Sequence, residues 1–286
     1  LKSTTFKCYK MVLERHFLPL HGENLASITS EQLGAILSKY KSPADMTVLS
    51  SFWNWACEPP RQYAKIDTLD VLKPKKRRKV DRKKKSKIVT LLPEEAEVLL
   101  STAWRENKSV CKSLAIAIFA GVRMEELKQL EPRHITKDHI VIDEEIAKTS
   151  SARHTPICAT LRAWIDACDQ EREPSEGTDR IVTSAWEVEY NRVRRLAGWD
   201  VTASRIPEGT PLPTRGTWDR NCMRHTCATV AIRTGKEIRD LEFEFGHNEG
   251  SAMLKKHYVN NRYLKEDAEK IMAIMPPATR SKARTA

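Results

Sequence analysis

The chain has 286 residues, of which 40% are hydrophobic and 30% charged, and its formal net charge is +11. This length suffices for one large hydrophobic core or two modest ones, so we expect two domains. The seven cysteines include no C-x-x-C pair, and the sequence shows no secretory leader and no apolar run long enough to cross a membrane. These features argue against a secreted or membrane protein and predict a reduced, cytoplasmic one, while the positive charge favours a polyanionic partner.

Residues 1–72 are expected to form a small helical domain. Apolar residues recur at three- and four-residue spacing, which is typical of amphipathic helices, in segments 6–20, 29–40 and 45–57. Thr29 or Ser30 is the expected cap of the second helix. Trp53 and Trp55 are expected in the core, because no further aromatic platform for stacking on DNA accompanies them. The first helix begins almost at the start of the chain, which is not a methionine, so we expect native residues to be missing before it.

A strongly basic segment, residues 73–87, follows. It reads KPKKRRKVDRKKKSK and holds eleven Lys or Arg and one acidic residue, so it carries +10 of the net charge of +11. Because it has almost no apolar side chain to bury, we expect an exposed connector between two folded parts. A basic connector between domains is suited to lie along the phosphate backbone of a bound duplex. The predicted phosphate contacts are Lys75, Lys76, Arg77, Arg78, Lys79, Arg82, Lys83, Lys84 and Lys85.

This segment has two other interpretations. Residues 74–80, PKKRRKV, look like a short nuclear import signal, which would give the protein a nuclear location. In the second interpretation, the segment is only a linker that keeps the protein soluble. We favour DNA contact over both.

Residues 88–275 are expected to form a second domain, mainly helical with a small antiparallel sheet. Pro93 falls in the first turn of a predicted helix, and the buried-type run KSLAIAIFAG ends at Gly121. Residues 201–219 are rich in Pro and Gly and are predicted to be a loop, with Asp219 as the cap of the next helix. Further helices are expected at 160–170 and 185–197, and a disordered tail at 276–286.

Four segments of this second domain carry residues suited to phosphodiester chemistry. They read GVRMEEL (121–127), AKTSSARHTPI (147–157), NCMRHTCAT (221–229) and FGHNEGSAMLKKHY (245–258). In this order they supply Arg123, Lys148, Arg224, His247 and Tyr258. The series resembles the tyrosine recombinases, the family of phage integrases and Xer-type enzymes. Each motif alone occurs by chance, but five such residues in this order are specific, and the resemblance spans roughly the last two thirds of the chain. It implies a helical core-binding domain followed by a tyrosine-recombinase catalytic domain.

The side chains themselves favour the same chemistry. A phosphodiester under attack carries a doubly negative centre, and arginines aimed at its non-bridging oxygens stabilise that charge. Arg123 and Arg224 are the candidates for this clamp, since a guanidinium donates two hydrogen bonds at once and keeps its proton. Tyr258 is the candidate nucleophile, which would form a phosphotyrosyl intermediate that stores the energy of the broken bond.

Lys148 is the candidate acid for the leaving 5′ oxygen. It lies between two short runs with strand-like alternation, 139–143 and 154–158, so we expect it near the tip of a β-hairpin. The resemblance implies that this lysine reaches the minor groove beside the scissile phosphate. An ordinary solvated lysine is the alternative.

Two further residues, Glu126 and Asn221, are assigned to the site, and His247 is given a role. Glu126 lies three residues after Arg123, so its carboxylate is expected to orient the guanidinium, unless the two form only a surface ion pair. His247 is the predicted donor to a phosphate oxygen, with His257 as a weaker competitor. Asn221 stands where the family has a histidine or lysine, and its amide cannot accept a proton at neutral pH.

We therefore expect a site-specific recombinase that acts on double-stranded DNA as a tetramer on paired sites, at the bacterial nucleoid. A type IB topoisomerase-like enzyme and a non-catalytic DNA-binding module are the alternatives. No Gly-rich phosphate loop is present, so no nucleotide cofactor is implied. Cys222 and Cys227 have no matching pair at zinc-site spacing, so we expect no metal.

An apolar stripe follows the candidate nucleophile. Its residues recur at helical spacing and are Leu264, Ala268, Ile271, Met272 and Met275. In the family, a helix at this place docks on a neighbouring subunit. Packing on its own domain is the equally weighted alternative.

Overall fold

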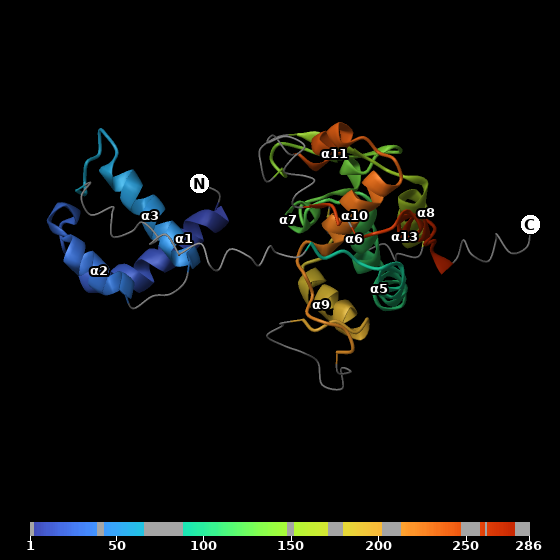
Figure 1. Ribbon diagram of the computed structural model, residues 1–286, viewed down its shortest axis with the longest axis horizontal. Coiled ribbons are helices and arrows are strands. Elements are labelled where there is room, and N and C mark those ends of the chain that lie inside the picture. Colours follow the sequence, from blue (N-terminus) through green and yellow to red (C-terminus); the bar gives the residue numbers. More distant parts are fainter. Residues whose placement is uncertain are drawn as a thin grey trace, which may run out of the picture. The chain divides into compact units, whose positions relative to one another are not determined.

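The computed structural model describes residues 3–38, 43–65, 88–147, 152–170, 180–201, 213–246, 258–260 and 262–277. The chain divides into two compact units, Leu1–Lys85 and Ser86–Ala286 (Figure 1). Both units consist mainly of helices, and the described part of the second also contains a two-stranded antiparallel sheet. The prediction of a mainly helical fold with a small antiparallel sheet is therefore confirmed.

The described helices of the N-terminal unit are α1 (Ser3–Phe17), α2 (Ser30–Ser38) and α3 (Pro43–Cys57). They pack around Leu33, Leu49 and Trp53, which are all fully buried. Trp53 is a core residue, as expected, but Trp55 is 47% exposed, so the expectation that it belongs to the core is wrong. The reason is geometric, because residues two positions apart on a helix are rotated by about 200° and point to nearly opposite faces.

Helix α2 begins with a capping box. The Thr29 hydroxyl accepts the backbone N–H of Gln32 at 3.2 Å, and the Gln32 side chain accepts the backbone N–H of Thr29 at 2.9 Å. Thr29 is thus the cap. Two 3-10 helices, η1 (Leu18–Leu20) and η2 (Leu25–Ser27), connect α1 to α2.

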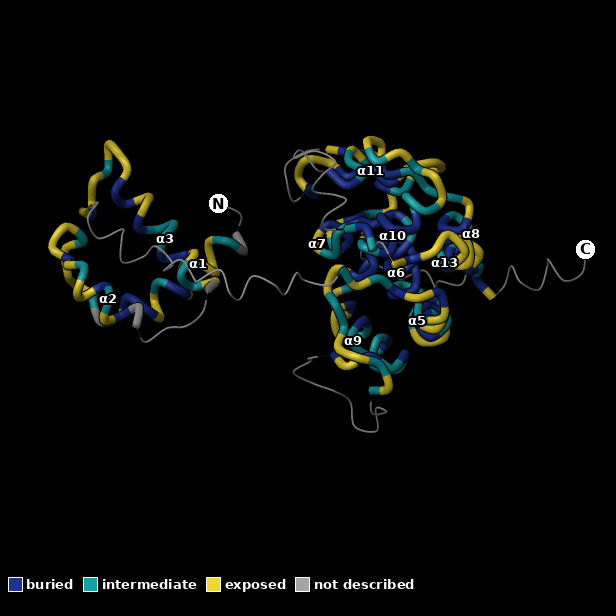
Figure 2. The backbone as a smooth tube through the Cα atoms, viewed as in Figure 1, coloured by how far each residue is buried: buried dark blue, intermediate teal, exposed yellow. Residues whose placement is uncertain are grey.

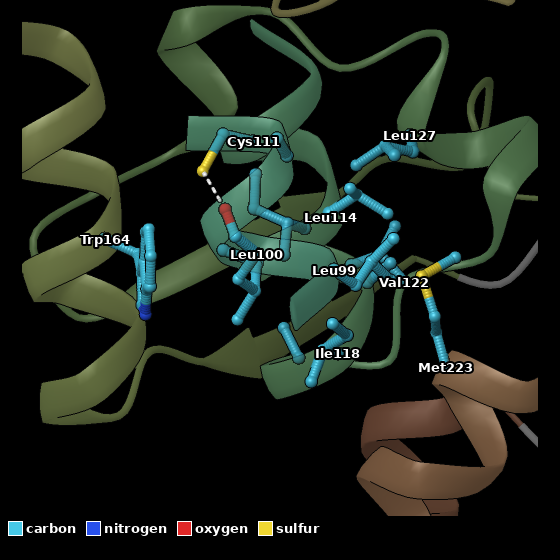
Figure 3. Packing of buried hydrophobic residues seen from close by; sticks show 14 of the residues in the cluster. Leu99, Leu100, Cys111, Leu114, Ile118, Val122, Leu127, Trp164 and Met223 are labelled. Atoms are coloured by element: carbon cyan, nitrogen blue, oxygen red, sulfur yellow. Dashed lines mark hydrogen bonds between the residues drawn. The ribbon is translucent and has the colours of Figure 1, made fainter. Parts of the chain in front are cut away.

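Helix α6 (Lys108–Phe119) lies at the centre of the second unit, and its residues from Val110 to Ile118 are all buried (Figure 2). It contacts α5 (Pro93–Glu106), α8 (Ala159–Gln170), α9 (Trp186–Leu196) and α10 (Cys222–Arg233). Figure 3 shows the core that these helices share, which includes Leu99, Leu100, Leu114, Ile118 and Trp164. Burying a side chain of this size stabilises the fold by about 1.5–3 kcal/mol. The predicted helices at 160–170 and 185–197 correspond to α8 and α9.

The short helices α7 (Met124–Leu127) and η5 (Pro132–His134) lead from α6 to the sheet. Strands β1 (His139–Ile142) and β2 (Arg153–Pro156) pair antiparallel, with Ile142 opposite Arg153, so the predicted hairpin is present. Strand β2 packs against α11 (Ile238–Phe245). Lys148 belongs to the connection between the strands but lies outside the described residues.

Helix α13 (Lys265–Met272) packs on α5 and α10 of its own unit. Ala268 and Ile271 are fully buried there, whereas Leu264 is 61% exposed. The preceding Tyr263 is also buried and donates its hydroxyl to the backbone oxygen of Leu91 at 2.9 Å. Of the two arrangements that the apolar stripe left open, packing on its own domain is the one that the structure contains.

Candidate active site

The first part of the site is the turn between α6 and α7. Gly121 has φ of +63°, and a Cβ at this position would lie 2.6 Å from the Phe245 ring, so only glycine fits. Arg123 follows as the N-cap of α7. Glu126 accepts the backbone N–H of Arg123 at 3.1 Å and its Nη1 at 3.0 Å. One carboxylate therefore orients both the backbone and the guanidinium of Arg123.

Glu126 is itself fully buried and lies between two arginines. Its second partner is Arg153, whose Nη2 donates to Oε2 at 2.5 Å. Burial alone would raise the pKa of Glu126, but the hydrogen bond and charge of Arg153, with the charge of Arg123, outweigh burial and lower this pKa. The carboxylate is thus ionised at neutral pH, and because it is fully buried its contact with Arg123 is not a surface ion pair.

Arg224 lies on α10 and is only 6% exposed. Its Nη1 donates to the backbone oxygen of Gly121, in the turn that carries Arg123, and its Nη2 donates to the backbone oxygen of Phe245 at 2.7 Å. Burial, and next the charge of Arg123, lower the pKa of Arg224 to about 9, so it stays cationic at neutral pH. The Nε atom is buried without a hydrogen-bond partner. Arg224 therefore keeps donor capacity beyond its two backbone contacts.

Tyr258 is half-buried beside Arg224, with its ring centre 5.5 Å from the guanidinium carbon. The ring also meets Phe245 edge-on, at 5.9 Å between ring centres. The backbone oxygen of Tyr258 accepts the Thr229 hydroxyl at 3.3 Å, and the same hydroxyl accepts the N–H of Asn260 at 3.0 Å. The segment that carries the tyrosine is thus fastened to α10, the helix that carries Arg224.

His225 is a site residue that the sequence analysis missed. Its ring lies edge-on to the Tyr258 ring, at 5.4 Å between centres. Its Nδ1 is 3.2 Å from the backbone oxygen of Val89, which can only accept, so Nδ1 carries the proton. Burial lowers the pKa of His225, although the contact with Val89 opposes this effect. A neutral His225 therefore presents Nε2 as an acceptor.

Arg153 was also not assigned to the site, although it lies in the segment 147–157 that supplies Lys148. One signal could have found it. Alternation along the strand places residue 153 on the inward face with Thr155, and a buried arginine requires partners.

The structure leaves part of the predicted site undescribed. Lys148, His247 and His257 lie outside the described residues, as do all nine predicted phosphate contacts between Lys75 and Lys85. Asn221 is described, and it is the exposed N-cap of α10. Its backbone N–H donates to the Asp219 carboxylate at 2.9 Å. Asp219 was predicted to cap this helix, and it accepts the backbone N–H of the N-cap residue itself.

In the described part of the chain, no group of three His, Cys, Asp or Glu side chains is placed to hold a metal ion. Cys222 and Cys227 are buried, and burial raises the pKa of both thiols, that of Cys227 to about 12. They are therefore protonated and pack as small hydrophobic residues. None of the described helices is both long and apolar enough to cross a membrane.

No protein-family model and no curated protein sequence matches this chain, but solved structures do. A lambda integrase dimer (residues 75–356) bound to a COC′ core site matches with a TM-score of 0.62 at 15% identity, over 92% of this chain and 91% of that one. The Tn1549 transposon integrase (residues 82–397) in complex with circular intermediate DNA matches with a TM-score of 0.53 at 15% identity, over 91% of each chain. A lambda integrase tetramer bound to a Holliday junction matches with a TM-score of 0.57 at 13% identity, over 90% of this chain and 72% of that one.

The chain has the fold of these integrases. At such low identity the similarity shows the integrase fold and not the role of any residue.

Proposed function

We propose that this protein is a tyrosine recombinase, which cuts and rejoins duplex DNA at specific sites without metal or ATP. The observation that carries the proposal is the position of Arg224, which contacts the Tyr258 ring and also binds the turn that holds Arg123. A tyrosine beside one arginine, which in turn binds the turn that carries a second arginine, is suited on an integrase fold to attack a phosphodiester.

In the proposed reaction the Tyr258 oxygen attacks the scissile phosphorus and the bond from phosphorus to the 5′ oxygen breaks. Arg123 and Arg224 stabilise the negative charge that develops on the non-bridging oxygens. The tyrosine proton leaves to solvent, and Lys148 gives a proton to the departing 5′ oxygen. The product is a 3′-phosphotyrosyl bond and a free 5′ hydroxyl. Attack by a 5′ hydroxyl, from the same or another strand, then rejoins the DNA and releases Tyr258.

The proposed substrate is double-stranded DNA, held by both units with residues 73–87 along the phosphate backbone. The +10 charge of this segment and the DNA bound in the similar integrase structures support the proposal. The lambda integrase tetramer on a Holliday junction supports assembly of four copies on two paired sites.

Covalent trapping tests the reaction. The protein is incubated with nicked duplexes of randomised sequence, from which the short fragment with its 5′ hydroxyl diffuses away after cleavage. We expect adducts that resist denaturation, linked through Tyr258 to the 3′ side of the break, and sequencing of the trapped DNA gives the target site. Tyr258→Phe should bind the same duplexes and form no adduct. Linkage through Tyr263, or no adduct at all, would refute the proposal.

Two assays on the target site distinguish recombination from topoisomerase-like relaxation of DNA. A recombinase exchanges strands between two copies of the site, whereas a topoisomerase-like enzyme relaxes a supercoiled plasmid without exchanging partners. We expect exchange between the two sites.

A further inference from the structure

Arg153 is a buried arginine that joins separate segments of the second unit. Its side chain is 4% exposed and lies on β2. Its Nη2 donates to Glu126 Oε2 at 2.5 Å, and its Nε donates to the backbone oxygen of Glu244 at 3.0 Å. The guanidinium therefore links the carboxylate that holds Arg123 to the C-terminal end of α11.

The end of α11 is shaped to receive this side chain. Gly246 ends the helix with φ of +59°, and a Cβ at this position would lie 3.3 Å from the Arg153 Cδ. The Thr155 hydroxyl donates to the same Glu244 oxygen at 3.3 Å. Two side chains of β2 therefore donate hydrogen bonds to the last turn of α11. Position 247 follows directly after this turn in the sequence.

We infer that Arg153 is a positioning residue of the proposed recombination site, which holds the Glu126 carboxylate against Arg123 and fixes the end of α11 beside it. The inference rests on the proposed function. Arg153 is too deeply buried to reach DNA and acts through Glu126.

An arginine suits this role better than a lysine. Its planar guanidinium reaches two acceptors in fixed directions, whereas an ammonium group is a single point of attachment. The remaining Nη1 is buried and has no hydrogen-bond partner. A buried donor left unpaired is unfavourable, and a pair of well-packed hydrophobic residues would stabilise the fold as well as the buried ion pair, although removal of one partner of the pair is destabilising. Stability alone therefore does not account for an arginine and a glutamate at these positions.

The charged groups around Glu126 come from three elements: Arg123 at the start of α7, Arg153 on β2 and Arg224 on α10. On the far side of Arg153, the Glu244 carboxylate is engaged by Lys236 at 2.6 Å. Burial raises the pKa of Glu126, and the cations lower it, with Arg153 as the main one. Without Arg153, Glu126 should become protonated at a higher pH and then release the Arg123 guanidinium.

The experiment compares Arg153→Gln and Arg153→Lys with a matched control, Arg162→Gln. Arg162 lies on α8 and also donates to backbone oxygens, those of Thr136 and Lys137, but does not contact Glu126. Single-turnover cleavage of a duplex that carries the target site found by covalent trapping is followed from about pH 5 to about pH 8. This range covers the titration of a carboxyl group with a raised pKa. DNA affinity is measured in parallel.

We expect Arg153→Gln to bind DNA normally but to cleave about 10²-fold more slowly at neutral pH, the size expected for a displaced catalytic group. Its rate should also fall on acidification with an apparent pKa above that of the unmodified protein. Adding Glu126→Gln should remove this acid dependence. Arg153→Lys should recover only part of the rate. A cleavage rate and pH profile equal to those of Arg162→Gln would overturn the inference.

A second readout needs no DNA and therefore separates the two proposals. If the unmodified protein forms no adduct, the proposed function fails, but the link between Arg153 and Glu126 is still decided by urea unfolding. The stability lost in Arg153→Gln should be greatest near neutral pH and should shrink on acidification, as Glu126 becomes protonated. An equal loss at every pH would overturn the inference.

Discussion

The Nη2 atom of Arg224 donates a 2.7 Å hydrogen bond to the backbone oxygen of Phe245, and the guanidinium carbon lies 3.9 Å from the centre of the Phe245 ring. Helix α10 is thus tied to the end of α11 by the side chain that also contacts Tyr258. The guanidinium of Arg224, a proposed catalytic group, therefore also contributes to the packing of these helices. Its removal should affect both stability and cleavage.

Arg123 and Arg224 should therefore respond differently to replacement by alanine. Arg123→Ala should lower single-turnover cleavage by about 10²- to 10³-fold while the protein stays folded, because its side chain is held mainly by Glu126. Arg224→Ala should also lower the free energy of unfolding, because two buried backbone oxygens lose their donor at about 1–3 kcal/mol each. Urea titration and cleavage rates measure the two effects. The exposed Arg220 provides the control, and unchanged cleavage in Arg123→Ala would contradict the proposed clamp.

His225 should make stability depend on pH near neutrality. Burial lowers its pKa in the folded protein, while in the unfolded chain the pKa is about 6.5. Below that pH the unfolded state binds more protons than the folded state, so the free energy of unfolding should fall as pH drops and should be constant above it. Arg224 adds to the lowering and Asp219 opposes it.

Urea unfolding at several pH values checks this prediction. His225→Gln should flatten the dependence between about pH 5 and about pH 7, whereas His154→Gln, at an exposed position on β2, should leave it in place. An undiminished slope in His225→Gln would show that another group is responsible.

The apolar stripe of α13 should be required for folding. Ile271→Ala should cost about 2–5 kcal/mol, because Ile271 is fully buried, whereas Leu264→Ala should cost less than about 0.5 kcal/mol at its exposed position. Truncation after Arg262 removes the buried Tyr263, Ala268 and Ile271 and should unfold the second unit. Thermal unfolding of the three variants measures this order. A folded truncated protein that binds one site and fails only to assemble on paired sites would instead support docking in trans.

Residues 73–87 should set the salt dependence of DNA binding. Replacing the Lys and Arg between Lys75 and Lys87 by Gln should weaken binding to all sequences alike and flatten the slope of log affinity against log salt, by about 0.9 for each phosphate that is no longer neutralised. Replacing only the lysines by arginine keeps the charge and should preserve the slope. If the Gln variant keeps its slope as well, the segment does not contact DNA.

Contacts between residues that are close along the chain could be predicted from the sequence. The i,i+3 spacing of Arg123 and Glu126 predicted their contact, and the alternation in two short runs predicted the hairpin. The roles of Arg153 and His225 escaped because their partners are distant, at 27 and 91 positions for Arg153 and 136 for the His225 contact with Val89. Local spacing cannot reveal such pairs, which depend on how helices and strands pack.

Asn221 provides the last prediction, because its place in the structure separates folding from chemistry. It is exposed at the N-cap of α10, and its side chain makes no capping hydrogen bond, while Asp219 accepts the first N–H. Substitutions at this position should therefore leave stability nearly unchanged. Changes in cleavage rate will report on the reaction itself.

We expect Asn221 to orient the scissile phosphate rather than to assist as a base. The guanidinium carbon of Arg224 lies 5.5 Å from the centre of the Tyr258 ring, and we expect water or hydroxide, rather than a side chain at position 221, to take the tyrosine proton. Asn221→Ala should then slow single-turnover cleavage by losing a hydrogen bond, and Asn221→His should be neutral or harmful. Had a general base been the missing group, the histidine variant would gain up to about 10²- to 10⁴-fold, with a new ionisation near neutral pH in its rate profile. Such a gain would show that proton removal from Tyr258 limits the unmodified protein.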